Sequence, residues 1–273
     1  MDILNILYNT APGRVILKPL SSRFLSDLSG KLMDTKASMC LIDPFVKKNG
    51  IDVDEYDISG VNSFNSFFCR PVNDGARPVC SEADALISPC DGLLTVLPIR
   101  EDTVIHVKQS SFNVSGLLQS EKIASRYEGG VCLVFRLCVD NYHRYCYVDS
   151  GEKSRNAFIP GVLHTVRPVA LEREPVFTEN CREYCLIRTE NFGTIVQMEV
   201  GAMLVGKIKN ELRDAGNVVR GEEKGHFEYG GSTIVVLIKK GVAELLPEIM
   251  ANSFDGVETP VKMGEKIGER HGR

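Results

Sequence analysis

The residues best suited to chemistry lie near the end of the chain, where Gly230-Gly231-Ser232-Thr233 leads into an apolar segment. Glycine on the acyl side leaves the carbonyl carbon of residue 231 unhindered and allows strained backbone conformations. The hydroxyl of Ser232 could attack that carbonyl and convert the amide into an ester, provided that a base takes its proton. If the ester then eliminates, Ser232 becomes dehydroalanine, loses ammonia and ends as a pyruvoyl group, which is an electrophilic ketone made without an added cofactor.

An activated serine needs a histidine and a carboxylate, and the chain offers candidates for both. His143 lies in Asn-Tyr-His-Arg, and Asp91 lies in Ser-Pro-Cys-Asp-Gly. Taken singly, each has an ordinary explanation, since His143 could be a hydrogen-bonded core residue and Asp91 a turn residue. Their combination with the Gly-Ser bond favours a catalytic role.

Five stretches of the chain, taken in order, resemble those of phosphatidylserine decarboxylases. They are Phe67–Pro71, Ser88–Gly92, Tyr142–Arg144, Val200–Gly206 and Lys224–Thr233, followed by a similar tail at Val261–Glu265. The resemblance covers nearly all of the chain except the first fifty residues. It implies a self-processing enzyme of phospholipid biosynthesis that converts membrane phosphatidylserine into phosphatidylethanolamine and carbon dioxide.

The resemblance also implies roles for the matching residues. Ser232 would be the nucleophile of self-cleavage, with scission after Gly231 giving a beta chain of residues 1–231 and an alpha chain of residues 232–273. The pyruvoyl group derived from Ser232 would form a Schiff base with the amine of the substrate. Asp91 would belong to the charge relay that activates Ser232, and His143 would face the substrate and assist decarboxylation or protonation.

Substrate binding is predicted for three residues near these motifs, namely Phe68, Arg70 and Arg144. Either arginine could hold the lipid phosphate through charge-assisted hydrogen bonds. No metal site is expected, because the nine cysteines include no Cys-x-x-Cys pair. We interpret these cysteines as reduced structural thiols.

One position departs from the family pattern. The family commonly has a second histidine three residues after the first, where this chain has Cys146. A thiol with an ordinary pKa of about 8.5 is a poor replacement for imidazole near pH 7. We expect the segment around His164 to return as a strand beside Cys146, because cross-strand neighbours lie within about 5 Å. His164 could then replace the missing imidazole, so the self-cleavage base remains open between His143 and His164.

The pattern of apolar residues predicts an α+β fold with one β-rich catalytic body, residues 51–273, built from barrel-sandwich-like strands. Residues 131–139 form a nearly continuous apolar run, typical of a buried strand. Residues 196–200 alternate between apolar and polar, which predicts a half-buried strand. Residues 233–240 are rich in β-branched side chains and end at Gly241.

Residues 1–50 are predicted to form amphipathic helices. Apolar side chains recur at intervals of three and four from Leu17 to Met33, and Ser21 or Ser22 could cap the helix. The helix could pack on the body or lie in a lipid interface. Residues 1–49 carry seven Lys and Arg against four Asp, which favours an anionic membrane over nucleic acid.

The longest apolar runs are strand-sized and no basic-then-apolar leader is evident at the N-terminus. We therefore expect a peripheral protein on the cytoplasmic face of the cell membrane. The sequence leaves open whether the protein forms a homodimer.

Three alternatives remain at this stage. The chain could decarboxylate another serine-containing lipid with the same residues. Glu199–Gly206 also resembles the hairpin of biotinyl and lipoyl carrier domains, although Met203 is flanked by Ala202 and Leu204 instead of a lysine. The third alternative is an uncleaved scaffold, which the persistence of the Gly-Ser bond, the aspartate and the histidine disfavours.

Overall fold

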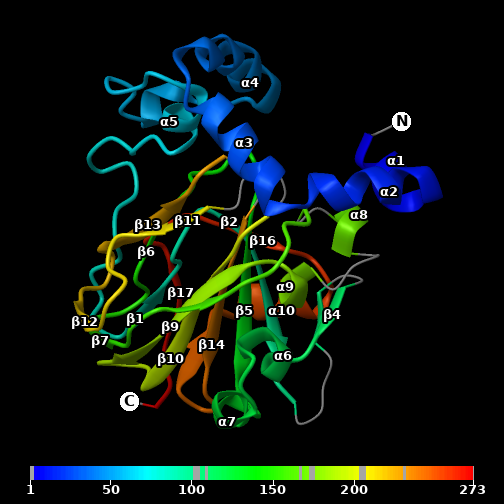
Figure 1. Ribbon diagram of the computed structural model, residues 1–273. Helices are drawn as coiled ribbons and strands as arrows, with labels where there is room; N and C mark the ends of the chain where they lie inside the picture. The colour runs from blue at the N-terminus through cyan, green and yellow to red at the C-terminus, as the bar shows by residue number, and fades with distance from the viewer. Residues whose placement is uncertain are drawn as a thin grey trace.

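A computed structural model describes residues 3–100, 105–107, 110–165, 168–171, 176–202, 207–229 and 232–272. Its centre is a nine-stranded sheet in which all neighbouring strands are antiparallel, in the order β12-β7-β9-β10-β14-β5-β2-β16, with β8 pairing beside β9. The strands are β2 (Gly92–Pro98), β5 (Val131–Leu137), β7 (Gly151–Lys153), β8 (Ala157–Ile159), β9 (Arg182–Thr189), β10 (Thr194–Val200), β12 (Gly216–Val218), β14 (Ser232–Ile238) and β16 (Thr259–Val261). The predicted α+β class is confirmed (Figure 1).

Three smaller sheets accompany the large one in the described part of the chain. They contain β1 (Ala85–Ile87), β17 (Lys266–Arg270) and β15 (Ala243–Leu245); β11 (Ile208–Asn210), β13 (Glu223–Phe227) and β6 (Arg144–Cys146); and β3 (Ile105–Val107) and β4 (Ser110–Phe112). The helices are α1 (Ile3–Asn9), α2 (Ala11–Leu20), α3 (Arg23–Met33), α4 (Ile42–Asn49), α5 (Phe64–Phe68), α6 (Val114–Leu118), α7 (Glu121–Ala124), α8 (Pro168–Leu171), α9 (Val176–Glu179) and α10 (Pro247–Phe254).

The large sheet is covered on both faces, which explains the continuous apolar character of β14. Side chains of strands point alternately to the two faces. Val235 and Leu237 belong to a core cluster with helices α6 and α9, while Ile234, Val236 and Ile238 belong to a second cluster with β6, β13 and β17. All seven residues of β14 are buried.

The prediction that residues 196–200 form a half-buried strand is wrong. Gln197 and Glu199 of β10 are completely buried, because the layer of β11, β13 and β6 covers their face of the sheet. Gln197 donates a hydrogen bond to the carbonyl oxygen of Cys146, and Glu199 pairs with Lys224. The alternation of polarity therefore distinguished the two faces of β10 correctly, but both faces lie in the interior of the protein.

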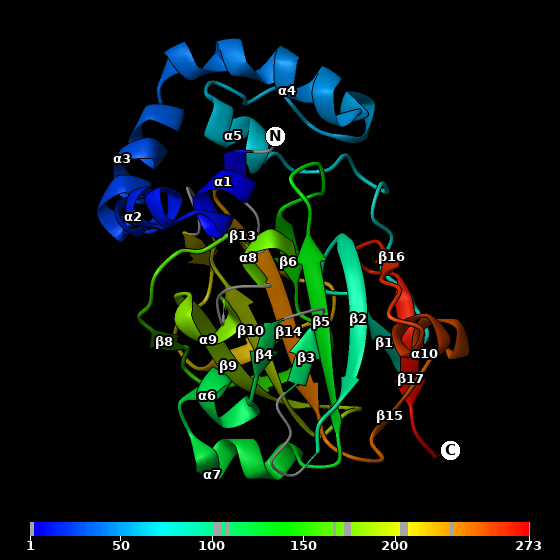
Figure 2. The ribbon, with the colours of Figure 1, turned by 90° about the vertical axis from the view of Figure 1, so that its right-hand side faces the viewer.

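The N-terminal segment lies over the end of the sheet at which β14 begins (Figures 1 and 2). The expected single helix is two helices, since α2 ends at Leu20 and α3 begins at Arg23. Leu17 is buried in the core, whereas Leu28 and Leu32 are exposed. The predicted packing of this segment on the body is therefore confirmed for α2, whereas α3 leaves these two apolar side chains exposed to solvent. Among the described helices, none is both long and apolar enough to cross a bilayer.

Candidate functional site

Ser232 is the first residue of β14, in the middle of the large sheet. It is paired with Leu137 of β5, and Thr233 is paired with Val200 of β10. The side chain of Ser232 is 1% exposed, and its Oγ has no hydrogen-bond partner among the described residues. Gly231, the other half of the predicted cleavage bond, lies outside those residues, as does Gly230.

Asp91 lies at the same end of the sheet as Ser232. It directly precedes β2, and Leu93 is paired with Arg136, the neighbour of Leu137. Asp91 and Ser232 are thus separated by one intervening strand, or about 10 Å at ordinary strand spacing. The strand register therefore places the start of β2, which follows Asp91, and the start of β14, which carries Ser232, at the same end of the sheet.

The carboxylate of Asp91 is held by Arg77, which the sequence analysis missed. Arg77 Nε and Nη2 donate to the two carboxylate oxygens over 2.7–3.0 Å, and the backbone N–H of Met263 donates to Oδ1 over 2.9 Å. Arg77 also donates to Glu55 over 2.9 Å. The predicted relay from Asp91 through an imidazole to Ser232 stays a prediction, since these contacts already occupy most acceptor positions of Asp91. No spacing pattern in the sequence links Arg77 to Asp91.

His143 is completely buried beside the segment that leads into Ser232. Its ring lies 4.0 Å from the ring of Phe68, and Phe68 packs edge-on against Tyr229, three residues before Ser232. His143 Nδ1 lies 2.8 Å from the carbonyl oxygen of Asn141. A carbonyl oxygen only accepts, so Nδ1 carries a hydrogen, and Nε2 is the ring nitrogen at which a proton can be exchanged.

Helix α5 fixes the position of Phe68 and, through it, that of His143. Ser63 and Ser66 form a capping box at the start of this helix, which satisfies its first backbone N–H groups. Asn65 donates to Asp34, which follows α3, and accepts a hydrogen bond from the backbone N–H of Tyr229. The N-terminal helices are thereby tied to the segment that precedes Ser232.

The predicted cross-strand pairing of Cys146 with His164 is wrong. Cys146 is paired with Glu223 of β13, while Val162 forms a bridge with Asn180. Burial raises the pKa of the Cys146 thiol to about 12, so it is protonated near pH 7.

His164 nevertheless lies near the end of the sheet that carries Ser232, although its ring faces another way. The Asn180 side chain donates to the carbonyl oxygens of His164 and of Gly201, the residue after β10. The ring of His164 approaches Tyr8 Oη over 3.2 Å through Nδ1 and Glu179 over 3.6 Å through Nε2. Its proposed role as the relay base stays a prediction, and these contacts do not favour it.

The three predicted substrate-binding residues are all engaged within the protein. Phe68 is buried against His143. Arg70 is 1% exposed, with its guanidinium 3.9 Å above the ring of Tyr56 and its Nη1 donating to the carbonyl oxygen of Phe67. Arg144 donates to the Cys69 carbonyl oxygen and to Glu223. A role for either arginine in holding phosphate stays a prediction.

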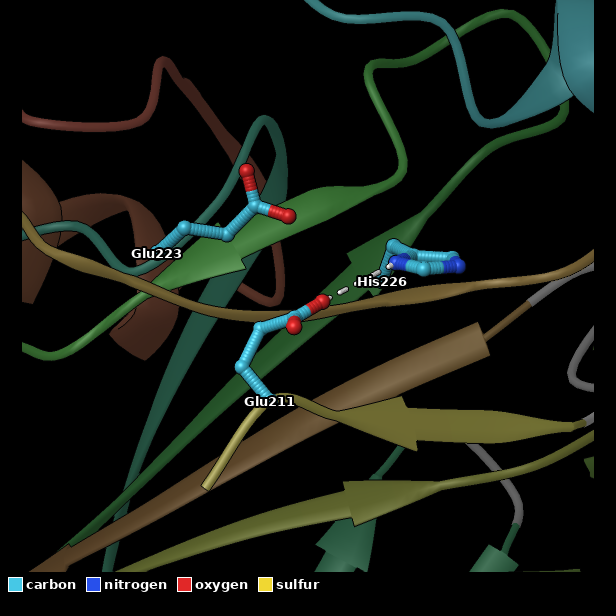
Figure 3. Close-up of side chains that lie close together, drawn as sticks. All are labelled: Glu211, Glu223 and His226. Carbon is cyan, nitrogen blue, oxygen red and sulfur yellow. Dashed lines mark ion pairs between the residues drawn. The ribbon is translucent and has the colours of Figure 1, made fainter.

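A group of metal-ligating type lies on the outer side of β13 (Figure 3). The donor atoms of Glu211, Glu223 and His226 lie within 4.8 Å of one another. Residues three apart on a regular strand face opposite ways, but an irregularity between Glu223 and Gly225 adds one residue and brings Glu223 and His226 to the same side. Arg144 lies 2.7 Å from Glu223. Burial chiefly, with a contribution from Arg144, lowers the pKa of His226. Because a cation already balances the carboxylate, we assign no metal to this group.

Comparison with known proteins gives consistent matches over almost the whole chain. A family model described as phosphatidylserine decarboxylase matches residues 64–269. Phosphatidylserine decarboxylase proenzyme 2 of Clostridium acetobutylicum is 44% identical over 267 residues, which cover 97% of this chain and 91% of that protein. The proenzymes of Clostridium beijerinckii and Clostridium tetani are 38% and 36% identical, over 96% and 98% of this chain and 90% and 92% of their own length.

The fold and these matches together define a carboxy-lyase that is made as a proenzyme. The chain belongs to the phosphatidylserine decarboxylase family. The resemblance inferred from five short stretches is confirmed, and all five lie within the matched residues. The match also runs through residues 199–206, which disfavours a carrier domain; residues 203–206 of that stretch lie outside the described structure.

Proposed function

We propose that the chain cleaves its own Gly231–Ser232 bond and that the product decarboxylates phosphatidylserine to phosphatidylethanolamine. The observation that carries this proposal is the position of Ser232, which directly follows Gly231 in the sequence and begins the buried strand β14, with a hydroxyl that has no partner in the described structure. A buried hydroxyl without a partner is unfavourable, so it needs an explanation. A nucleophile that must attack its own preceding carbonyl supplies one.

A pyruvoyl group fits at this position. Ser232 begins a strand held on both sides, by β5 and by β10, so a group formed there would be fixed at the end of the sheet that also carries Asp91. Such a group would supply an electron-accepting carbonyl to which the substrate amine can be joined, as pyridoxal cofactors do.

His143 is the residue that we assign to proton transfer in turnover. The hydrogen bond from Nδ1 to Asn141 orients the ring, and Phe68 packs against it. The protonated ring can therefore donate a proton from Nε2 to the carbon from which carbon dioxide has left.

The first expected result is that purified protein consists of two fragments, residues 1–231 and 232–273. The smaller fragment should be lighter than a peptide starting with serine by one ammonia, which intact-mass measurement detects. An active preparation composed only of uncut chain would contradict the proposal.

The two fragments should remain together after cleavage. Residues 232–272 contribute β14 to the middle of the large sheet, β16 to its edge, and β15 and β17 to a smaller sheet. We expect them to coelute in native size-exclusion chromatography and to separate in denaturant.

The N-terminal helices are proposed to dock on the cytoplasmic face of the cell membrane. Val15 and Ile16 of α2 are 70% and 55% exposed, and Leu32 of α3 is 58% exposed. These helices lie at the Ser232 end of the body (Figure 2), so docking there would bring the site close to lipid headgroups. Apolar side chains of this kind bury in the interfacial region of a bilayer, and nearby basic residues add attraction to anionic lipids.

Replacing Val15 and Ile16 together by aspartate should therefore reduce binding to vesicles that contain phosphatidylserine. Binding of the unchanged protein should weaken with salt, because exposed charges are screened. Val219→Asp is the matched control, since Val219 is 62% exposed and follows β12, away from these helices (Figure 1). Equal loss in the control, measured by vesicle flotation, or no loss in the double variant would argue against docking through α2.

A further inference from the structure

Glu199 lies on the same face of the large sheet as Ser232, on the neighbouring strand. Glu199 of β10 is paired with Ile234, and Val200 is paired with Thr233. The same register carried one residue beyond the end of β10 places Gly201 opposite Ser232. Residues two apart on a strand share a face, so Ser232 faces the side of Ile234 and Glu199. That side holds the cluster with Ile234, Val236 and Ile195.

The position directly opposite Ser232 carries no side chain, because residue 201 is glycine. Glu199 is therefore the nearest side chain of β10 on this face. Diagonal neighbours on adjacent strands lie about 7–8 Å apart, with a somewhat shorter Cβ separation. A glutamate side chain can cover most of that distance.

One oxygen of Glu199 is fixed and the other has no partner. Oε2 accepts hydrogen bonds from Lys224 Nζ over 2.6 Å and from Asn210 over 3.2 Å. Oε1 is buried and, like Ser232 Oγ, has no hydrogen-bond partner among the residues described. An acceptor and a hydroxyl, both unsatisfied, thus lie on one covered face of two adjacent strands.

Three other groups considered for the relay are less suitable as the base, and His143 is tested separately below. The Cys146 thiol is protonated near pH 7, as argued above. The ring of His164 contacts Tyr8 and Glu179, and Asp91 is bound by Arg77. Burial, which outweighs the nearby Lys224 charge, raises the pKa of Glu199, and a carboxylate with a raised pKa is a stronger base.

We propose that Glu199 is the base of self-cleavage, with Lys224 as the residue that holds it in position. This rests on the proposed function. The Ser232 hydroxyl proton moves to Glu199 Oε1 as Oγ forms a bond with the carbonyl carbon of residue 231. As the C–N bond breaks, the same proton passes to the departing nitrogen, so that an amide becomes an ester without gain or loss of atoms. His143 then acts only in turnover.

The test compares cleavage in four forms of the full chain. Glu199→Gln combined with Lys224→Met removes both charges and leaves no unpaired buried ion, which avoids the main cause of misfolding. We expect its cleavage to slow by about 10²–10⁴-fold, the usual contribution of a general base. Glu183→Gln is the matched control, because Glu183 is a buried carboxylate paired with Glu199 on β9, one strand further from Ser232; it should cleave normally. His143→Ala should cleave but not decarboxylate.

Cleavage is followed by denaturing gels, and hydroxylamine is added to capture any ester. The proposal would be supported if the double variant gave neither fragment and no hydroxylamine-sensitive chain while its circular dichroism spectrum matched that of the unchanged protein. Normal cleavage in the double variant would overturn it, as would a block of cleavage in His143→Ala. Failure of the unchanged chain to cleave would instead contradict the proposed function itself.

Discussion

Ser232→Ala should leave a single uncut chain and reduce decarboxylation to the background rate. The reason is that the hydroxyl is needed twice, first to attack the preceding carbonyl and then as the precursor of the pyruvoyl group. Gel analysis and release of carbon dioxide from phosphatidylserine measure the two losses. The fold should not suffer, because removing a buried hydroxyl without a partner is nearly neutral.

Thr233→Val is the matched control for this substitution. Thr233 is also completely buried, and its Oγ1 also has no partner in the described part of the chain. It points to the opposite face of β14, since adjacent residues of a strand alternate. Valine keeps its shape, so this variant should cleave and decarboxylate normally. Loss of cleavage in Thr233→Val would show that general damage to β14, and not the Ser232 hydroxyl, explains the first result.

The sequence was sufficient for features that depend on local pattern. The continuous apolar character of residues 131–139 and 233–240 predicted β5 and β14, and both are buried central strands. The ordered motifs predicted the family, which the comparisons confirm. These features can be predicted because apolar runs and short motifs depend only on residues that are close together in the sequence.

The features that were missed depend on contacts between distant segments. Arg77 binds Asp91 from fourteen residues away in the sequence. Lys224 of β13 donates a hydrogen bond to Glu199 of β10, so this contact joins the smaller sheet to the large one. Glu199 looked like the exposed position of an alternating strand, because alternation does not say whether the polar face is covered. The expected pairing of His164 with Cys146 was wrong for a similar reason. The segment between them contains β7 and β8, which both pair with β9, and no local pattern shows which strand a following segment will pair with.

Arg77→Met should lower the free energy of unfolding by about 3–5 kcal/mol, the usual cost of removing one partner of a buried ion pair. Arg77 and Asp91 are almost fully buried. Asp91 also joins the two predicted fragments, since the backbone N–H of Met263 donates to the carboxylate that Arg77 holds. The variant and its parent are best compared by urea unfolding in the Ser232→Ala background, where neither is cut. Arg188→Met is the matched control, because Arg188 pairs with Glu152 over 2.6 Å but both side chains are mostly exposed. It should cost no more than about 1 kcal/mol.

The loss should also depend on pH in a defined direction. A hydrogen bond from Arg77 lowers the pKa of Glu55 from its ordinary value of 4.5. A carboxyl group with a lowered pKa in the folded state contributes stability above its unfolded pKa, and that stability is lost as pH falls through the folded value. The difference in unfolding free energy between the parent protein and the Arg77→Met variant should therefore shrink below about pH 4.5. Adding Asp91→Asn to Arg77→Met should recover part of the loss, because no unpaired carboxylate then remains buried beside β2. A difference that is constant from about pH 7 to about pH 3, and unchanged by Asp91→Asn, would mean that Arg77 stabilises the fold through packing alone.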